Sequence, residues 1–186
     1  MKMTLQTPAS LHVQRWLDTM VIAHNFCPFA SYVRNNNQIR YAECESADMA
    51  DALTMLQNEC ELLDNNPTVA TTLLILPTGW AEFDDFLLLI DMAQQCIEHW
   101  DYSGTYQLAT FHPDYLFDGE DPQSASHYTN RAPHPVLHII REKDVTEALK
   151  HYDAPQDIPE VNIAKAEALG CPHLAAQLAA CKSEEY

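Results

Sequence analysis

The sequence predicts an α/β fold with one four-stranded mixed sheet flanked by helices, in a single domain over residues 1–186. Amphipathic helical segments alternate with short, strongly apolar runs that are rich in β-branched residues, which is typical of layered α/β proteins. The chain has 186 residues, of which 47% are hydrophobic, and a chain of this size and composition can bury a substantial core.

The first third of the chain contains two predicted helices and one strand. A helix over residues 10–25 is capped by Ser10 and followed by a short turn of helix that Pro28 can begin. Residues 39–45 (IRYAECE) alternate between polar and apolar and predict the first strand. Ser46 then caps a helix over 47–64.

The remaining predicted elements follow the same alternation. They are strands at 68–77, 105–112 and 136–142, a helix at 83–100, and C-terminal helices opened by capping boxes at Asp144/Glu147 and Asp157/Glu160, with Gly170 as a helix-ending residue. Right-handed crossovers predict that the first three strands are parallel. The fourth is expected to return antiparallel, because a loop and not a helix precedes it.

This topology predicts two groups of polar residues at opposite edges of the sheet. Ligands of open α/β sheets bind beyond the carboxyl ends of the parallel strands. That edge is expected to carry residues 43–46, 78–82, His112, Asn130, Arg131 and His134. Arg141 is expected at the opposite edge, nearer Cys27 and Arg34.

The stretch FHPDYLFDGEDPQSASHYTNRAPHPVLH, residues 111–138, shows no clear helical or strand period. Irregular segments of this length inside a domain are uncommon and are usually functional or disordered. His112-Pro113 and His134-Pro135 bracket the segment, and proline favours an extended backbone at the residue before it. We expect the segment to form the wall of a ligand site.

Composition excludes several classes of partner and motif. A formal net charge of −17 disfavours nucleic acid and anionic membrane surfaces. The six cysteines form no C-x-x-C pair, and the chain shows neither a signal peptide nor an apolar run of membrane-spanning length. We therefore expect a soluble, cytoplasmic protein with reduced thiols. With only four glycines, it lacks dinucleotide-binding, P-loop and nucleophile-elbow motifs.

Several motifs together resemble one protein family. They are RWL at 15–17, CPFA at 27–30, IRY at 39–41, TTLLILP at 71–77, FHPDYLF at 111–117, TNRAPHPVLHIIRE at 129–142, NI at 162–163 and LG at 169–170. This combination is similar to the domain-of-unknown-function 1415 family across nearly the whole chain. The resemblance implies no catalytic residues. Family members more often carry Ser and Tyr at the positions of Ala132 and His134, which argues against His134 as an indispensable ligand.

The first functional hypothesis is an enzyme or binding domain for a small anionic metabolite. Arg131 would hold a carboxylate or phosphate, because a planar guanidinium can bind either group through two hydrogen bonds. Asn130 and Tyr115 would support binding. His112 would transfer a proton, since imidazole titrates near neutral pH, with Glu43 assisting. Pairing with surface carboxylates is the alternative role for each of the five arginines.

Two alternatives remain open at this stage. A metal-dependent or thiol-based enzyme would use Cys27, His112 and His138, although no ligand spacing supports a metal site. Cys27 has a low pKa if it caps a helical turn and is inert if it is buried. The third hypothesis is a non-catalytic adaptor whose acidic surface meets a basic partner. Arg141 is a further candidate for substrate binding. No cofactor, reaction type or oligomeric state follows from the sequence.

Overall fold

The computed structural model describes residues 7–150 and 154–183. The helices are α1 (Pro8–Trp16), η1 (Leu17–Ile22), α2 (Ala30–Asn35), α3 (Met49–Asn65), α4 (Phe83–His99), η2 (Ala125–Thr129), α5 (Glu142–Leu149), η3 (Pro155–Asp157), α6 (Ile158–Leu169) and α7 (Cys171–Ala180). The strands are β1 (Ile39–Glu43), β2 (Thr71–Ile75), β3 (Tyr106–Phe111) and β4 (Val136–Arg141). The structure therefore has the predicted α/β architecture with one four-stranded mixed sheet.

The sheet has the strand order β1-β2-β4-β3. Only β1 and β2 form a parallel ladder, and β4 pairs antiparallel with both β2 and β3. The prediction of three parallel strands plus one was therefore wrong in its pairing, because β3 pairs only with the antiparallel β4, although β3 runs in the same direction as β1 and β2. The crossover rule assumes that successive strands add side by side, whereas here β4 lies between β2 and β3. β4 pairs antiparallel with both of its neighbours, and antiparallel strands need no helical crossover between them.

The pairing register nevertheless brings together, at one edge of the sheet, the strand ends that the sequence assigned to the ligand-binding edge. Glu43 pairs with Ile75, Ile75 with Val136, and Val136 with Phe111. The carboxyl ends of β1, β2 and β3 and the amino end of β4 therefore share that edge. The other edge carries Arg141, which pairs with Tyr106.

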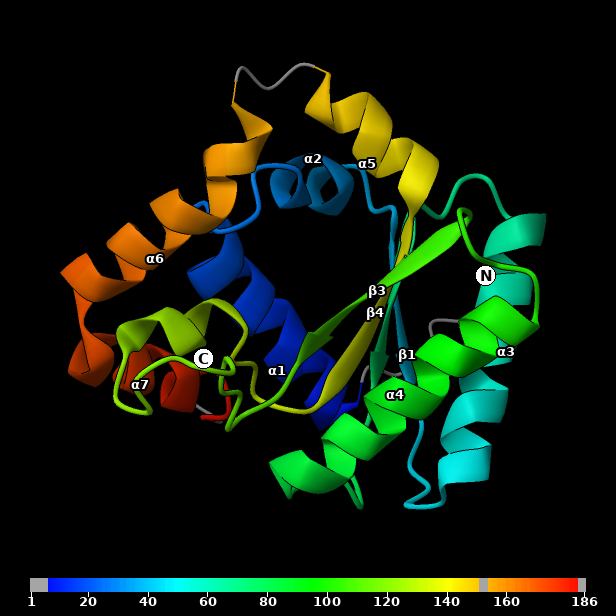
Figure 1. Cartoon of the computed structure of the whole chain (residues 1–186), viewed down its shortest axis with the longest axis horizontal. Helices are drawn as coiled ribbons and strands as arrows, with labels where there is room; N and C mark the ends of the chain where they lie inside the picture. The colour runs from blue at the N-terminus through cyan, green and yellow to red at the C-terminus, as the bar shows by residue number, and fades with distance from the viewer. Residues whose placement is uncertain (1–6, 151–153, 184–186) are drawn as a thin grey trace.

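Helices cover both faces of the sheet (Figure 1). One face packs against α3 and α4, with Leu56, Leu63, Phe86 and Leu89 fully buried against β2 and β4. The other face packs against α1, η1, α6 and α7 through residues such as Val13, Trp16 and Met20. All five residues of β2 are buried, as expected for a strand that is covered on both faces.

The first helix begins and ends differently from the prediction. Thr7, and not Ser10, is its N-cap, and the Thr7 hydroxyl oxygen accepts a hydrogen bond from the Ser10 backbone N–H at 3.3 Å. From Leu17 the helix widens into a π-helix that ends at Ile22. Asp48 similarly replaces Ser46 as the N-cap of α3. Other residues that can cap a helix lie close to Thr7 and to Asp48 in the chain. The sequence pattern therefore located the starts of α1 and α3 only approximately.

Of the two predicted C-terminal capping boxes, the one at Asp144 was wrong, and the one at Asp157 was right only in the position of the N-cap. Arg141 is the N-cap of α5 and Asp157 is the N-cap of α6, and neither side chain makes a capping hydrogen bond. Gly170 does end α6, with a φ of 79° that suits glycine. Within the described ranges, the structure contains no helix that is long and apolar enough to cross a membrane.

Candidate functional site

A cavity of about 540 Å³ lies between β3, η1, the segment after β3 and the start of α6. This volume is in the range of small-molecule sites, which are mostly apolar with a few placed polar groups. Its apolar wall is made by Val21, Phe26, Ala109, Phe111, Phe117, Ile158, Pro159 and Ile163. Its other lining residues are Cys27, Asp118, Glu120, Ser126, Thr129, Asn130 and Asn162.

The irregular segment 111–138 supplies much of this wall, from Phe111 to Asn130. Two buried histidines hold the segment in place. The His112 backbone N–H donates to the Asn130 oxygen at 3.2 Å. In the middle of the segment, the Nδ1 of His127 accepts from the Phe117 backbone N–H at 3.1 Å, and its Nε2–H donates to the Asp121 oxygen at 2.8 Å. The segment is thus an ordered wall, with η2 at its centre.

Three polar side chains of the cavity wall each donate one hydrogen bond to the protein backbone. The Asn162 side-chain amide donates to the Phe26 backbone oxygen at 2.6 Å. The Asn130 side-chain amide donates to the Thr110 oxygen at 3.1 Å. The Thr129 hydroxyl donates to the Ser126 backbone oxygen at 2.8 Å. Each carboxamide therefore donates one of its two N–H groups to the backbone. The Asn130 oxygen accepts a 3.3 Å hydrogen bond from the Thr129 hydroxyl, and the Asn162 oxygen has no partner among the described residues.

Cys27 lies in this wall, partly buried, beside the first residues of α2. Burial raises the pKa of its thiol, and hydrogen bonds from the backbone N–H groups of Phe29 and Ala30 only partly offset that rise. Both effects considered in the sequence analysis therefore act on Cys27. The helix start favours the thiolate, but desolvation of the buried thiol outweighs that effect. The thiol is protonated near neutral pH.

Arg131 follows Asn130 in the chain but is not part of the cavity wall. Its Nε–H donates to the Tyr115 backbone oxygen at 3.2 Å, and its guanidinium carbon lies 4.5 Å from the centroid of the Tyr128 ring. No carboxylate in the described part of the chain pairs with Arg131. Arg34 pairs with the exposed Asp18, as expected for a surface arginine, whereas Arg40 pairs with the buried Glu59. Arg131 and Tyr115 are thus brought together, although Tyr115 contributes its backbone at this contact.

His112 is fully buried at the end of β3. Its Nε2–H donates to the Trp80 backbone oxygen at 2.9 Å, and its Nδ1 accepts from the Asp114 backbone N–H at 3.0 Å. Burial lowers the pKa of the imidazole, and the hydrogen bond to Trp80 offsets part of that effect. Both ring nitrogens are occupied by the backbone, so the imidazole is held as a neutral tautomer between two loops.

Glu43 lies at the same sheet edge as His112 but on the far strand. Phe111, next to His112, is separated from Glu43 by three strand spacings, roughly 14 Å. The Glu43 carboxylate accepts a hydrogen bond from the Thr7 hydroxyl. The structure therefore does not bring Glu43 together with Arg131 or His112.

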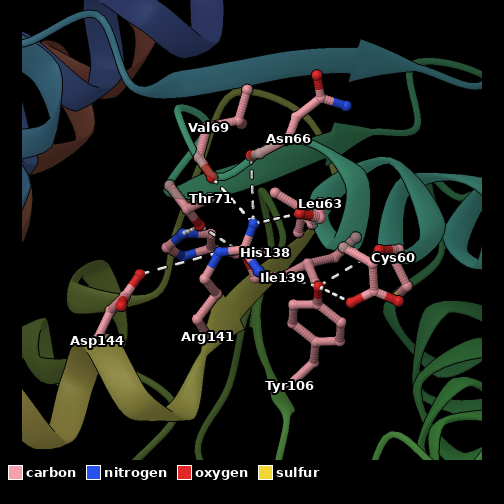
Figure 2. Close-up of polar contacts among 11 residues, drawn as sticks. Cys60, Leu63, Asn66, Val69, Thr71, Tyr106, His138, Ile139, Arg141 and Asp144 are labelled. Carbon is pink, nitrogen blue, oxygen red and sulfur yellow. Dashed lines mark hydrogen bonds and ion pairs between the residues drawn. The ribbon is translucent and has the colours of Figure 1, made fainter.

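Arg141 sits at the opposite sheet edge and is buried among backbone carbonyls (Figure 2). Its Nη2 donates to the oxygens of Leu63, Asn66 and Val69, and its Nη1 donates to the Tyr106 hydroxyl at 3.1 Å. Asp144 lies 3.9 Å from its Nε. The guanidinium thus satisfies the carbonyls at the C-terminal end of α3, as basic side chains do at such ends. Cys27 does not join it, because Cys27 lies in the cavity wall with Asn130.

His138 lies in β4, on the sheet face opposite α3 and α4. The Thr71 hydroxyl donates to the Ile139 oxygen at 2.6 Å, so the Nε2–H of His138 must donate to the Thr71 hydroxyl oxygen, 2.7 Å away. Burial lowers the pKa of this imidazole to about 4. In the part of the chain that the structure describes, no three His, Cys, Asp or Glu side chains gather so as to hold a metal ion. The hypothesis of a Cys27, His112 and His138 metal centre therefore gains no support.

Sequence reasoning missed most of the cavity. Phe26 and Asn162 come from segments 136 residues apart and share a hydrogen bond in its wall. Phe117 was visible only as part of the irregular segment. One signal could have pointed to Asn162, namely the NI pair at 162–163 among the motifs of the family resemblance. The pair stands out because the helix around it has only a weak apolar pattern.

The fold and the cavity define an α/β protein with a partly open, largely apolar cavity beside the edge strand β3. The chain belongs to the family described as "Protein of unknown function (DUF1415)", whose model matches residues 9–176. This assignment confirms the resemblance seen in the sequence. No curated protein and no solved structure matches the chain.

Proposed function

We propose that the protein binds a small molecule in the 540 Å³ cavity, with the ligand's apolar part against the phenylalanines and its polar part against Asn130 and Asn162. The observation that carries this proposal is the combination of a ligand-sized volume with carboxamide oxygens that no strong donor of the protein engages. Binding sites in α/β proteins have this composition. Cys27 is the one thiol in the wall, but its protonated state makes ligand binding a better-supported activity than thiol chemistry.

The test is a cavity-filling substitution. Ala109 lines the cavity from β3 and is only partly buried, so Ala109→Phe occupies ligand volume without replacing a core side chain. Gln107→Phe is the matched control, because Gln107 is an exposed residue of the same strand and does not line the cavity. A fragment library is screened against the ¹⁵N-labelled protein by NMR.

We expect fragments that perturb the amides of residues 117–130 and of α6, and that bind the Gln107→Phe variant but not Ala109→Phe. Thermal melting of each variant verifies that it folds. Fragments that bind Ala109→Phe as tightly as the parent protein, or that perturb only other regions, contradict the proposal. Ile163→Trp, at the exposed rim of the cavity on α6, provides a second occluding variant should Ala109→Phe unfold.

An anion site at Arg131 is the second candidate function. It is supported by a guanidinium that Tyr115 and Tyr128 orient and that pairs with no described carboxylate in a chain of net charge −17. Arg15→Gln is a matched control for Arg131→Gln, because Arg15 is also held by one backbone oxygen, that of Ser183. Phosphate and acetate should raise the melting temperature of the parent and of Arg15→Gln, but not that of Arg131→Gln. Equal stabilisation of all three proteins argues against the anion site.

A further inference from the structure

We propose that the ligand of the cavity is an organic cation: a small amine, protonated to an ammonium, on an apolar or aromatic body. This inference rests on the cavity-binding function proposed above and adds the chemical class of the ligand. Three features of the wall carry it, namely its charge, its hydrogen-bonding groups and its aromatic rings.

The charged residues of the wall all have the same sign. Asp118 and Glu120 line the cavity, and its wall includes no Lys, Arg or His. Neither carboxylate has an ion-pair partner in the described part of the chain. Both residues are exposed, at the open side of the cavity, where they attract a cation and repel an anion. The net charge of −17 adds a field of the same sign.

The wall also offers carboxamide oxygens to a ligand that donates hydrogen bonds. Asn162 gives its amide N–H to the Phe26 oxygen, and its carboxamide oxygen has no partner within the described ranges. Asn130 gives its amide N–H to the Thr110 oxygen. Its own oxygen receives only a 3.3 Å contact from the Thr129 hydroxyl, whose better acceptor is Ser126. An ammonium has three donors, so it can donate to these oxygens, while the second N–H of each carboxamide stays without a partner among the described residues.

The aromatic rings of the wall favour the same ligand. Phe26, Phe111 and Phe117 all line the cavity. The faces of such rings carry partial negative charge and attract ammonium groups, most strongly where water is excluded. Phe117 and Asp118 are consecutive in the chain and both line the cavity. A neutral ligand would use the rings but not the carboxylates, and an anion would be repelled by both.

The test compares three probes of one shape that differ in charge: 2-phenylethylamine, 2-phenylethanol and phenylacetate. Their affinities are measured by NMR titration against the full chain at low salt. We expect the amine to bind about tenfold or more tighter than the alcohol, with the acetate weakest, and we expect the preference for the amine to shrink when salt is raised to about 0.5 M. Ala109→Phe should abolish binding of the amine.

A pair of double variants locates the origin of the preference. Asp118→Asn with Glu120→Gln should bring the affinity for the amine down to that for the alcohol. Asp91→Asn with Glu98→Gln is the control, because it changes the net charge equally at two exposed positions on α4, on the other face of the sheet. This control should keep the preference for the amine.

The outcomes separate the two proposals. If the alcohol binds as tightly as the amine, or if both double variants lose the preference equally, the cation inference is overturned and the cavity function stands. If none of the three probes binds at millimolar concentration, or if binding persists in Ala109→Phe, the cavity function falls and the cation inference falls with it.

Discussion

The Nε2–H of His112 donates a hydrogen bond to the backbone oxygen of Trp80, 2.9 Å away, and so ties the end of β3 to the loop between β2 and α4. The ring also accepts from Asp114 at 3.0 Å. The His112 side chain is fully buried and joins two loops through both ring nitrogens. Its main contribution is therefore to the stability of the fold.

Replacing His112 by Ala should therefore lower the free energy of unfolding by about 2–4 kcal/mol. The substitution removes a buried ring and leaves the Trp80 oxygen and the Asp114 N–H without partners. Urea denaturation measures the change. His99→Ala, at an exposed position of α4, should change stability by less than about 0.5 kcal/mol. Unchanged stability in His112→Ala would restore the catalytic hypothesis for this residue.

Arg141→Met should destabilise the protein by about 3 kcal/mol or more. The methionine keeps part of the apolar volume but leaves the carbonyls of Leu63, Asn66 and Val69 without their shared donor in a buried site. The measurement is again the free energy of unfolding in urea. Lys150→Met, which breaks only the exposed ion pair with Glu147, is the control and should cost less than about 0.5 kcal/mol. A small effect at Arg141 would reopen a binding role for it.

Stability should fall as the pH drops from about 6.5 towards 4. The Nδ1 of His12 and the Nε2 of His134 share a hydrogen bond of 3.0 Å, so one of the two rings must remain an acceptor. Burial, Lys182 and His12 lower the pKa of His134 to about 4, and burial and Arg15 lower the pKa of His12. The unfolded chain therefore binds protons at a higher pH than the folded one. His134 costs up to about 1.4 kcal/mol per pH unit in this window, and the more exposed His12 contributes a smaller share because solvent screens it.

The variant His134→Gln tests this origin of the acid sensitivity. Glutamine can still hydrogen-bond with His12 but does not titrate. Melting temperatures measured between pH 7 and pH 4 should fall less steeply in the variant than in the parent protein. The variant His173→Gln, at an exposed position of α7, should leave the slope unchanged. Parallel slopes for the parent and His134→Gln would contradict the assignment.

Cys27 should react slowly with iodoacetamide at pH 7.5. Burial raises the pKa of its thiol, and only the thiolate is nucleophilic, so the rate should be about tenfold or more below that of the same cysteine in urea-unfolded protein. Peptide mapping by mass spectrometry follows this residue separately from the other five cysteines. Because Cys27 lines the cavity, a bound ligand should slow its alkylation further. A rate equal to that of the unfolded chain would revive the thiol-enzyme hypothesis.

The segments whose pattern is local were predictable. β2 is apolar at nearly every position, and its burial on both faces follows from that composition. α4 begins at the predicted residue 83, because an apolar helical period and two acidic residues in the first turn mark it. The irregular segment after β3 was also correctly placed, although its internal order through His127 was not visible in the sequence.

The sequence by itself determined the family, the kinds of element and their order, because helical and strand periods are encoded in neighbouring residues. The tertiary structure alone decided that β4 lies between β2 and β3, that His112 and Arg141 bond to backbone groups, and that Phe26, Cys27, Asn130 and Asn162 share one cavity. Each of these facts depends on contacts between residues far apart in the chain. Such contacts are settled by burial and by the pairing of polar groups across the whole fold, which no local pattern records.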